Sequence, residues 1–171
     1  MRVALRPIGD IGADADVLPR LARDIGEVFS LDAEVGDSLP LSQHAFNSSR
    51  RQYSATWLLS YLRSVSAPPA TAVLGVTAED LYAEGLNFVF GQAEMPGRCA
   101  VISLHRLRPG RGETNDELFY RRALKEAVHE IGHTLGLGHC PDPLCVMHFS
   151  NTIADTDHKA AGLCSLCQAR L

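Results

Sequence analysis

Long apolar runs are missing from this chain of 171 residues. A membrane-spanning helix needs about 18 or more consecutive apolar residues, and no stretch approaches that length. The first residues do not form the apolar core of a secretion signal either, because Arg6 and Pro7 interrupt the run. The sequence therefore predicts a cytoplasmic protein that has no membrane partner.

An excess of positive charge is missing as well. The 16 Lys and Arg residues face 20 Asp and Glu residues, which gives a formal net charge of −4. Proteins that bind nucleic acids are typically basic, so we expect no nucleic-acid partner. The sequence shows no internal repeat, and its length suits one domain, residues 1–171, with one sizeable core. We expect this domain to be a monomer.

One short stretch reads H-E-x-x-H-x-x-G-x-x-H. Residues four apart share one face of an α-helix, so His129 and His133 can offer imidazole nitrogens to the same ion. Glu130 lies one step round the helix, from where its carboxylate can reach a water bound to that ion. Gly136 tolerates the left-handed conformation that ends a helix, and the turn can bring His139 back to the other two histidines.

Three histidine nitrogens leave one position of a tetrahedral zinc ion open, which distinguishes catalytic from structural zinc sites. We therefore predict a catalytic zinc ion held by His129, His133 and His139, with Glu130 as the catalytic base. The alternative is that these histidines reflect surface composition alone. The glycine and the third histidine at fixed spacing argue against it.

The chain has five cysteines. Four of them occur as one pair with four intervening residues and one pair with two, at Cys140, Cys145, Cys164 and Cys167. This set fits a closed tetrahedron of thiolates around a structural zinc ion, so we predict two zinc ions per chain. The alternative is two disulfides or reactive thiols, which a reducing cytosol disfavours. Cys99 lies in an apolar run and is predicted to be an inert buried thiol.

The histidine motif resembles the zinc signature of the metzincin clan of metallopeptidases, and its direct connection to four cysteines resembles the archaemetzincins. The resemblance is tight over residues 129–167. It implies a hydrolase that acts on a peptide or protein substrate, and it implies that Met147 is the methionine of the Met-turn beneath the metal. Phe149 departs from clan members with a tyrosine at this place, because phenylalanine has no hydroxyl to donate to an oxyanion.

Apolar periodicity predicts an α/β chain in which helices pack on a mixed sheet. The predicted strands are residues 3–8, 32–35, 71–77, 87–92 and 99–104. The predicted helices are residues 16–29, residues 52–64, which Pro68 and Pro69 terminate, and an active-site helix that begins near Asn115 after a capping box of Thr114 and Glu117. By the resemblance, residues 87–92 form an antiparallel edge strand that rims the cleft.

The segment after Gly136 has little apolar material. We therefore predict an N-terminal subdomain, residues 1–136, and a C-terminal subdomain, residues 137–171, which the cysteine-bound zinc stabilises. Within the latter, Asp155, Asp157 and Lys159 are predicted to form a solvated helix start.

Two functions are consistent with these patterns. The first is a zinc-dependent metallopeptidase in which Glu130 activates a zinc-bound water. The second is a zinc-stabilised peptide-binding module with weak or no peptidase activity, which the phenylalanine at position 149 favours. The carboxylate of Glu130 beside an open metal site favours the peptidase, because a binding module has no need of it.

Overall fold

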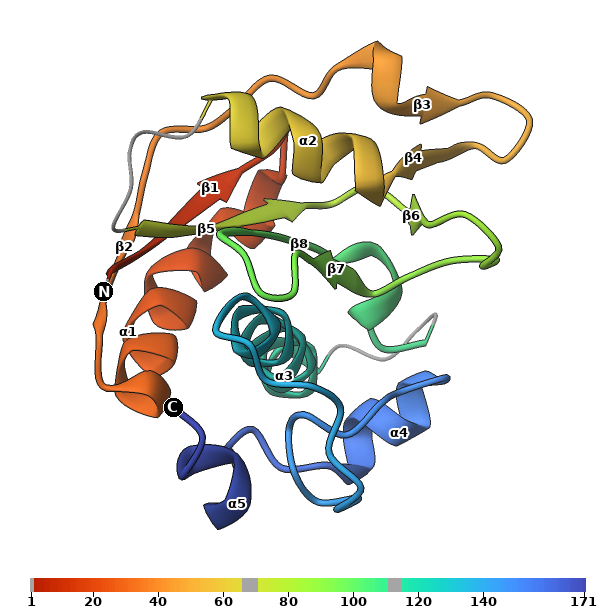
Figure 1. The fold of residues 1–171 in the computed structure, drawn as a ribbon. Coiled ribbons are helices and arrows are strands. Elements are labelled where there is room, and N and C mark those ends of the chain that lie inside the picture. Colours follow the sequence, from red (N-terminus) through yellow and green to blue (C-terminus); the bar gives the residue numbers. More distant parts are fainter. Residues whose placement is uncertain (1, 66–70, 111–114) are drawn as a thin grey trace.

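The computed structural model describes residues 2–65, 71–110 and 115–171, and its centre is a twisted sheet (Figure 1). The sheet has five strands in the order β2-β1-β5-β8-β7. The first four strands are parallel, and β7 is antiparallel to β8 at one edge. Their bounds are β1 Arg2–Pro7, β2 Asp32–Val35, β5 Thr71–Thr77, β7 Gly91–Ala93 and β8 Cys99–Ser103.

Helices cover both faces of this sheet (Figure 1). Helices α1 (Val17–Phe29) and α3 (Asp116–Thr134) lie on one face, and α2 (Ala55–Val65) lies on the other. Strand β8 explains the division, because successive side chains of a strand point to opposite faces. Ala100 and Ile102 join the core beneath α1 and α3, whereas Cys99 and Val101 join the core beneath α2. The predicted fold class, helices packed on a mixed sheet, is confirmed.

A second, smaller sheet of three strands extends the α2 side. It contains β3 (Phe46–Asn47), β4 (Gln52–Ser54) and β6 (Leu81–Tyr82). One prediction fails here, because the helix predicted over residues 52–64 begins only at Ala55. Gln52 and Tyr53 pair with β3, and the Ser54 hydroxyl accepts a hydrogen bond from the Trp57 amide (3.2 Å) where the helix begins. Pro68 and Pro69 lie outside the described residues.

The edge strand is shorter than predicted and lies further along the chain. Residues 87–92 were expected to form it, whereas β7 covers Gly91–Ala93. Val89 instead forms an antiparallel bridge to Leu81 of the small sheet. Residues 86–89 thus leave the main sheet and connect the two sheets, whereas the Phe90 carbonyl still accepts from the Ser103 amide of β8 (2.8 Å) and the predicted antiparallel edge is present at β7.

Helix α3 begins and ends where the sequence indicates. Asn115 caps it by accepting a hydrogen bond from the Leu118 amide (2.9 Å), and Thr114 lies outside the described residues. Gly136 has a φ of +91°, the left-handed conformation predicted to turn the chain after the helix. Three short 3₁₀ segments complete the N-terminal part, at Gly12–Asp16, Gln43–Ala45 and His105–Leu107.

Residues 137–171 carry two short helices, α4 (Ile153–His158) and α5 (Ser165–Gln168). Basic residues of α3 hold α4 in place. Arg122 pairs with Asp157, and the ammonium of Lys125 donates to the carbonyls of Thr156 (2.9 Å) and Asp157 (3.0 Å), at the end of α4 where carbonyls lack partners within the helix. The prediction of a solvated helix start is wrong for Lys159, whose side chain is fully buried.

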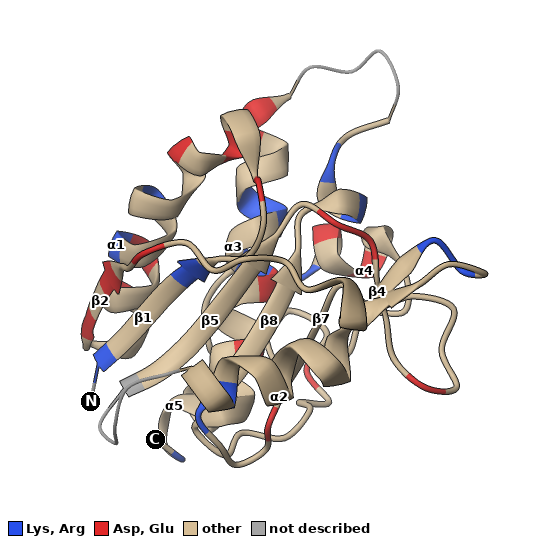
Figure 2. Ribbon diagram, turned by 90° about the horizontal axis from the view of Figure 1, so that it is seen from above, with Lys and Arg blue, Asp and Glu red and all other residues tan. Residues whose placement is uncertain are grey.

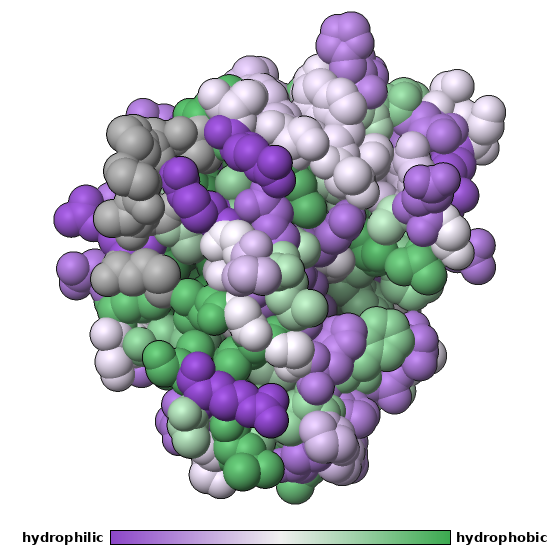
Figure 3. Space-filling view, viewed as in Figure 1, coloured by the Kyte–Doolittle hydropathy of each residue, from purple (hydrophilic) through white to green (hydrophobic). Residues whose placement is uncertain are grey.

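Charged residues of both signs are interspersed over the elements in the view of Figure 2. Hydrophobic and hydrophilic side chains likewise mix over the face shown in Figure 3. Among the described residues, no helix is both long enough and apolar enough to cross a membrane.

Candidate metal centres

Three histidines meet at the C-terminal end of α3. His129 and His133 project from consecutive turns of the helix, and their Nε2 atoms lie 3.0 Å apart. The turn at Gly136 returns His139 to them, with ring centroids 5.4 Å from His129 and 4.9 Å from His133. One ring nitrogen from each histidine falls within 4.8 Å of the others. Nitrogens bound to one tetrahedral zinc ion lie roughly 3.4 Å apart, so the spacing fits a single ion.

Backbone carbonyls orient two of these rings. The Nδ1 atom of His129 lies 2.8 Å from the carbonyl oxygen of Val146, and that of His133 lies 2.7 Å from the carbonyl oxygen of Leu137. A carbonyl only accepts hydrogen bonds, so each Nδ1 carries the proton and each Nε2 presents a lone pair. Burial also lowers the pKa of His129 to about 2. Two neutral imidazoles whose lone pairs face each other suit a bound cation.

The side chain of Glu130 lies against the edge strand. Its side chain is buried, and burial raises its pKa well above the ordinary value, with Glu126 adding to the rise. A Cβ built on Gly91 of β7 would lie 2.7 Å from both Cγ and Oε1 of Glu130. The carboxyl group therefore occupies the space that a side chain at position 91 would fill.

The four predicted cysteines also meet. Sγ of Cys140 lies 3.8 Å from that of Cys164, and Sγ of Cys145 lies 3.8 Å from that of Cys167. A disulfide requires about 2.05 Å, and all five cysteines are free thiols. Sulfur atoms about 2.3 Å from a tetrahedral zinc ion lie roughly 3.8 Å from one another. The spacing thus fits a zinc ion with four thiolates, whereas Cys99 is buried elsewhere, as predicted.

The two clusters share one stretch of backbone. The Cys140 amide donates to the Met147 carbonyl (2.9 Å), and the neighbouring Val146 carbonyl orients His129. Met147 itself is fully buried, and a Cβ added to Gly132 of α3 would lie 2.4 Å from its sulfur atom. The methionine therefore packs directly against the helix that carries both histidines, in the position that the resemblance implied.

Comparison with known proteins agrees with this arrangement. The family model described as peptidase family M54 matches residues 35–171. The archaemetzincin of Methanocaldococcus jannaschii is 44% identical, over 100% of this chain and 93% of the relative. The chain belongs to peptidase family M54, the archaemetzincins. It is accordingly a zinc metallopeptidase, and the predicted family and enzyme class are confirmed.

Solved archaemetzincin structures share the fold. The crystal structure of the Archaeoglobus fulgidus protein complexed with malonate superposes with a TM-score of 0.85 at 39% identity, covering 100% of both chains. The structure of the Methanopyrus kandleri protein also gives a TM-score of 0.85, at 41% identity, covering 99% of this chain and 92% of that one.

A cavity of about 270 Å³ adjoins the histidine cluster of this M54 chain. The edge segment from Leu86 to Gly91 forms one wall, and α3 contributes Glu126, His129 and Glu130. The opposite wall comes from the C-terminal segment: Phe149, Ser150, Asn151 and Lys159.

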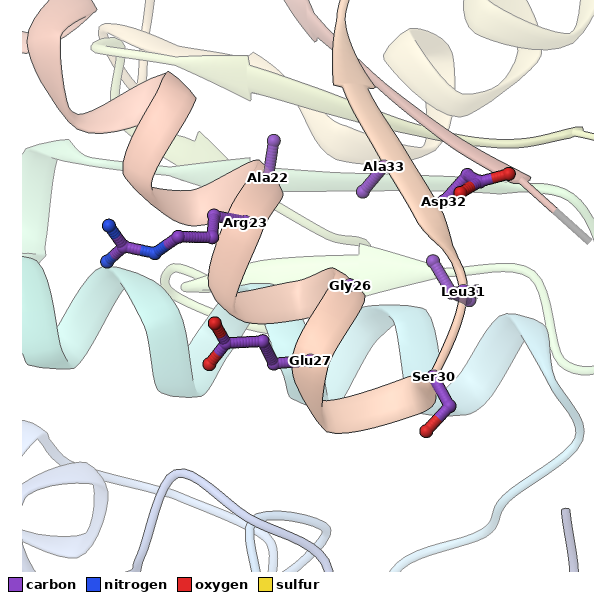
Figure 4. Close-up of a pocket in the computed structure, with 8 residues that line it drawn as sticks. All are labelled: Ala22, Arg23, Gly26, Glu27, Ser30, Leu31, Asp32 and Ala33. Atoms are coloured by element: carbon purple, nitrogen blue, oxygen red, sulfur yellow. The ribbon is translucent and has the colours of Figure 1, made fainter.

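A wider hollow of about 630 Å³ lies between α1 and β2, away from both clusters. Figure 4 shows that its two long charged side chains, Arg23 and Glu27, lie on the side of α1 turned away from β2. It therefore gathers no set of converging functional groups.

Sequence reasoning missed several residues of the 270 Å³ cavity. Glu126 lies four residues before Glu130, so helical spacing alone places both on one face of α3. Lys159, Ser150 and Gly91 carry no such local signal, since only the fold brings them to α3.

Proposed function

We propose that His129, His133 and His139 hold a catalytic zinc ion and that Glu130 is the catalytic base of peptide hydrolysis. The supporting observation is that the three histidine nitrogens converge and that one of the three, His129, borders the same cavity as the buried carboxyl group of Glu130. A second, structural zinc ion is held by Cys140, Cys145, Cys164 and Cys167 and stabilises residues 137–171 as a C-terminal subdomain on residues 1–136.

Zinc at the histidine site supplies Lewis acidity, since it lowers the pKa of a bound water to about 7 and polarises a carbonyl group. The side chains and backbone of the protein orient the ligands and transfer the proton. Carbonyls of Val146 and Leu137 keep two imidazoles in the ligating tautomer. Glu130 accepts the proton of the attacking water on its carboxylate and returns it to the leaving nitrogen. Burial of Glu130 excludes bulk water, which would compete for that proton.

The substrate backbone extends the sheet beside β7. This strand is at the edge of the order β2-β1-β5-β8-β7, so its outer hydrogen-bonding groups are available to an extended peptide. Gly91 of this strand contacts Glu130, so a peptide paired with the edge passes the catalytic carboxylate. The substrate is a peptide or protein, and the monomeric state and cytoplasmic location stay predictions.

The alternative, a peptide-binding module, is favoured by Phe149. Its ring centroid lies 5.0 Å from that of His139, and it has no hydroxyl that could donate to an oxyanion. The decisive assay incubates zinc-loaded protein with a peptide library and identifies products by mass spectrometry. We expect cleavage that a chelator abolishes and added zinc restores. Peptides that bind at micromolar concentration but stay intact would support the binding module and overturn the peptidase mechanism.

Substituting Gly91 tests how closely β7 positions the catalytic base. Gly91→Ala places a methyl group against Glu130 and forces that side chain to move. We expect the hydrolysis rate to fall about 10- to 100-fold, because displacement of a reacting group by about 1 Å has effects of this size. Zinc content should not change, since neither Gly91 nor Glu130 is a proposed zinc ligand.

The matched control is Gly110→Ala, where an added Cβ meets nothing within 4 Å. It should hydrolyse at the normal rate. If Gly91→Ala is as active as this control, the edge strand does not set the position of Glu130.

A further inference from the structure

The cavity beside the histidine cluster has an ion pair in its wall. Nζ of Lys159 lies 3.6 Å from Oε1 of Glu126, and the two side chains are 0% and 4% exposed. Glu126 comes from α3 and Lys159 from the C-terminal segment, and both line the cavity together with Glu130. Two buried opposite charges thus lie within one small space next to the proposed reaction centre.

The hydrogen bonds of this wall are incomplete within the described part of the chain. The ammonium of Lys159 has three donors and makes one hydrogen bond, to the carbonyl of His148 (3.2 Å). The hydroxyl of Ser150 is buried and has no partner among the described residues. Oε1 of Glu126 accepts a hydrogen bond from the Thr156 hydroxyl (2.9 Å) and is also the oxygen that faces Lys159. Neither of these two contacts involves Oε2 of Glu126.

A ligand that fits this wall must supply both acceptors and donors. Lys159 and Ser150 call for an acceptor, whereas Glu126 calls for a donor. A buried polar group left without a hydrogen-bond partner is unfavourable, so an aliphatic side chain in the cavity is disfavoured.

Charge decides between the polar candidates. Glu130 serves the attacking water in the proposed mechanism, and the other two charges of the lining, Lys159 and Glu126, compensate each other, so their pair has no net charge to offer a ligand. A carboxylate that approached Lys159 would also approach Glu126, and an ammonium that approached Glu126 would also approach Lys159. A charged side chain buried without its own counter-ion is costly. A neutral group with both a carbonyl and an N–H satisfies the wall without this cost.

We propose that this cavity selects a carboxamide side chain, glutamine or asparagine, beside the scissile bond of the substrate. The carbonyl oxygen of the amide accepts from Lys159 and Ser150, and its NH₂ group donates to Glu126. The aromatic rings of the lining, Phe88, Phe90 and Phe149, pack against the aliphatic part of the side chain. This inference rests on the proposed peptidase function, which sets the cavity next to the cleaved bond.

Two readouts test it. The first is cleavage of a peptide series that differs only at the residues flanking the cleavage site, with Gln, Asn, Leu, Glu or Lys. The second is calorimetric binding of the same peptides to zinc-loaded Glu130→Gln protein, which is expected to bind without hydrolysis. We expect Gln or Asn peptides to be cleaved about tenfold faster than Leu, Glu and Lys peptides. We expect them to bind the Glu130→Gln protein about tenfold more tightly as well.

Two variants connect this preference to the cavity wall. Ser150→Ala removes the unpartnered hydroxyl and is expected to fold normally, and the preference for Gln over Leu should fall about threefold. Glu126→Met/Lys159→Met replaces the ion pair by apolar side chains of similar size, an exchange that buried ion pairs often tolerate. This variant should prefer Leu over Gln. The matched control is Arg20→Met/Glu117→Met, which removes a surface ion pair and should keep the preference for Gln.

The outcomes separate the two proposals. A wild-type protein that binds Gln peptides selectively but cleaves none contradicts the peptidase mechanism and supports the carboxamide site. A protein that cleaves or binds Leu, Glu or Lys peptides as well as Gln peptides contradicts the carboxamide site. The carboxamide site is also contradicted if the preference for Gln over Leu is the same in both variants as in the wild-type protein.

Discussion

Glu130→Gln is expected to lower the rate of peptide hydrolysis about 10²- to 10⁴-fold, the range typical for loss of a general base. Glutamine has nearly the same shape as glutamate, so it should occupy the space beside Gly91 without disturbing the fold. It cannot take up a proton from the attacking water. The carboxylate does not belong to the histidine cluster, so the content of both zinc ions should stay the same.

The measurement combines steady-state cleavage of one peptide with metal analysis of the same protein sample. Glu117→Gln is the control, because this glutamate lies on the same helix but on the surface, where it pairs with Arg20. It should keep full activity. A Glu130→Gln protein that retains full zinc content and more than about a tenth of the normal rate would show that another group takes the proton.

Cys164→Ser/Cys167→Ser is expected to lower the melting temperature by about 10 °C or more and to remove one zinc ion per chain. Metal binding contributes directly to the folding of small segments with little core, and residues 137–171 contain mainly short helices and turns. Amide hydrogens of this segment should exchange faster than in the unaltered protein, while those of the central sheet should not.

The same variant should also bind zinc more weakly at the histidine site. Its two substituted residues follow Gly162, whose carbonyl accepts from the Val146 amide (3.1 Å), and the Val146 carbonyl in turn orients His129. Release of the cysteine cluster therefore loosens the carbonyl that orients the His129 ring, and loss of such a contact weakens metal binding about 10- to 100-fold.

Cys99→Ala is the control for the loss of buried sulfur. This thiol lies under α2, in a different part of the core. The Cys99→Ala protein should have a slightly lower melting temperature, but it should still bind two zinc ions with normal affinity at the histidine site. If the double variant behaves like Cys99→Ala, the cysteine cluster is not a structural metal site.

The sequence predicted those features that depend on local spacing. Histidines four apart on one helix face, a glycine able to adopt positive φ, and the helix start near Asn115 are all set by residues close together in the chain. The buried strands at residues 71–77 and 99–104 were predicted equally well, because each is an apolar run with a turn or loop at its ends.

Features that depend on distant partners were not predicted. Residues 87–92 were predicted as one strand, but a bridge from Val89 to Leu81 takes the first part of this segment out of the main sheet. Gln52 and Tyr53 continue a helical pattern, but pairing with β3 and β6 makes them a strand. Lys159 follows two acidic residues and resembles a surface residue, and its burial is stabilised by partners distant in the sequence, the carboxylate of Glu126 and the carbonyl of His148.

The most direct test of the two-metal account is an anomalous difference map, recorded at the zinc absorption edge, from crystals of the zinc-loaded chain. The account predicts two peaks per chain, one within bonding distance of nitrogens of His129, His133 and His139, and the other enclosed by the sulfur atoms of the four cysteines. A map with a peak at the cysteines and none at the histidines would contradict the proposed catalytic site. A map with no peak at the cysteines would contradict the structural one.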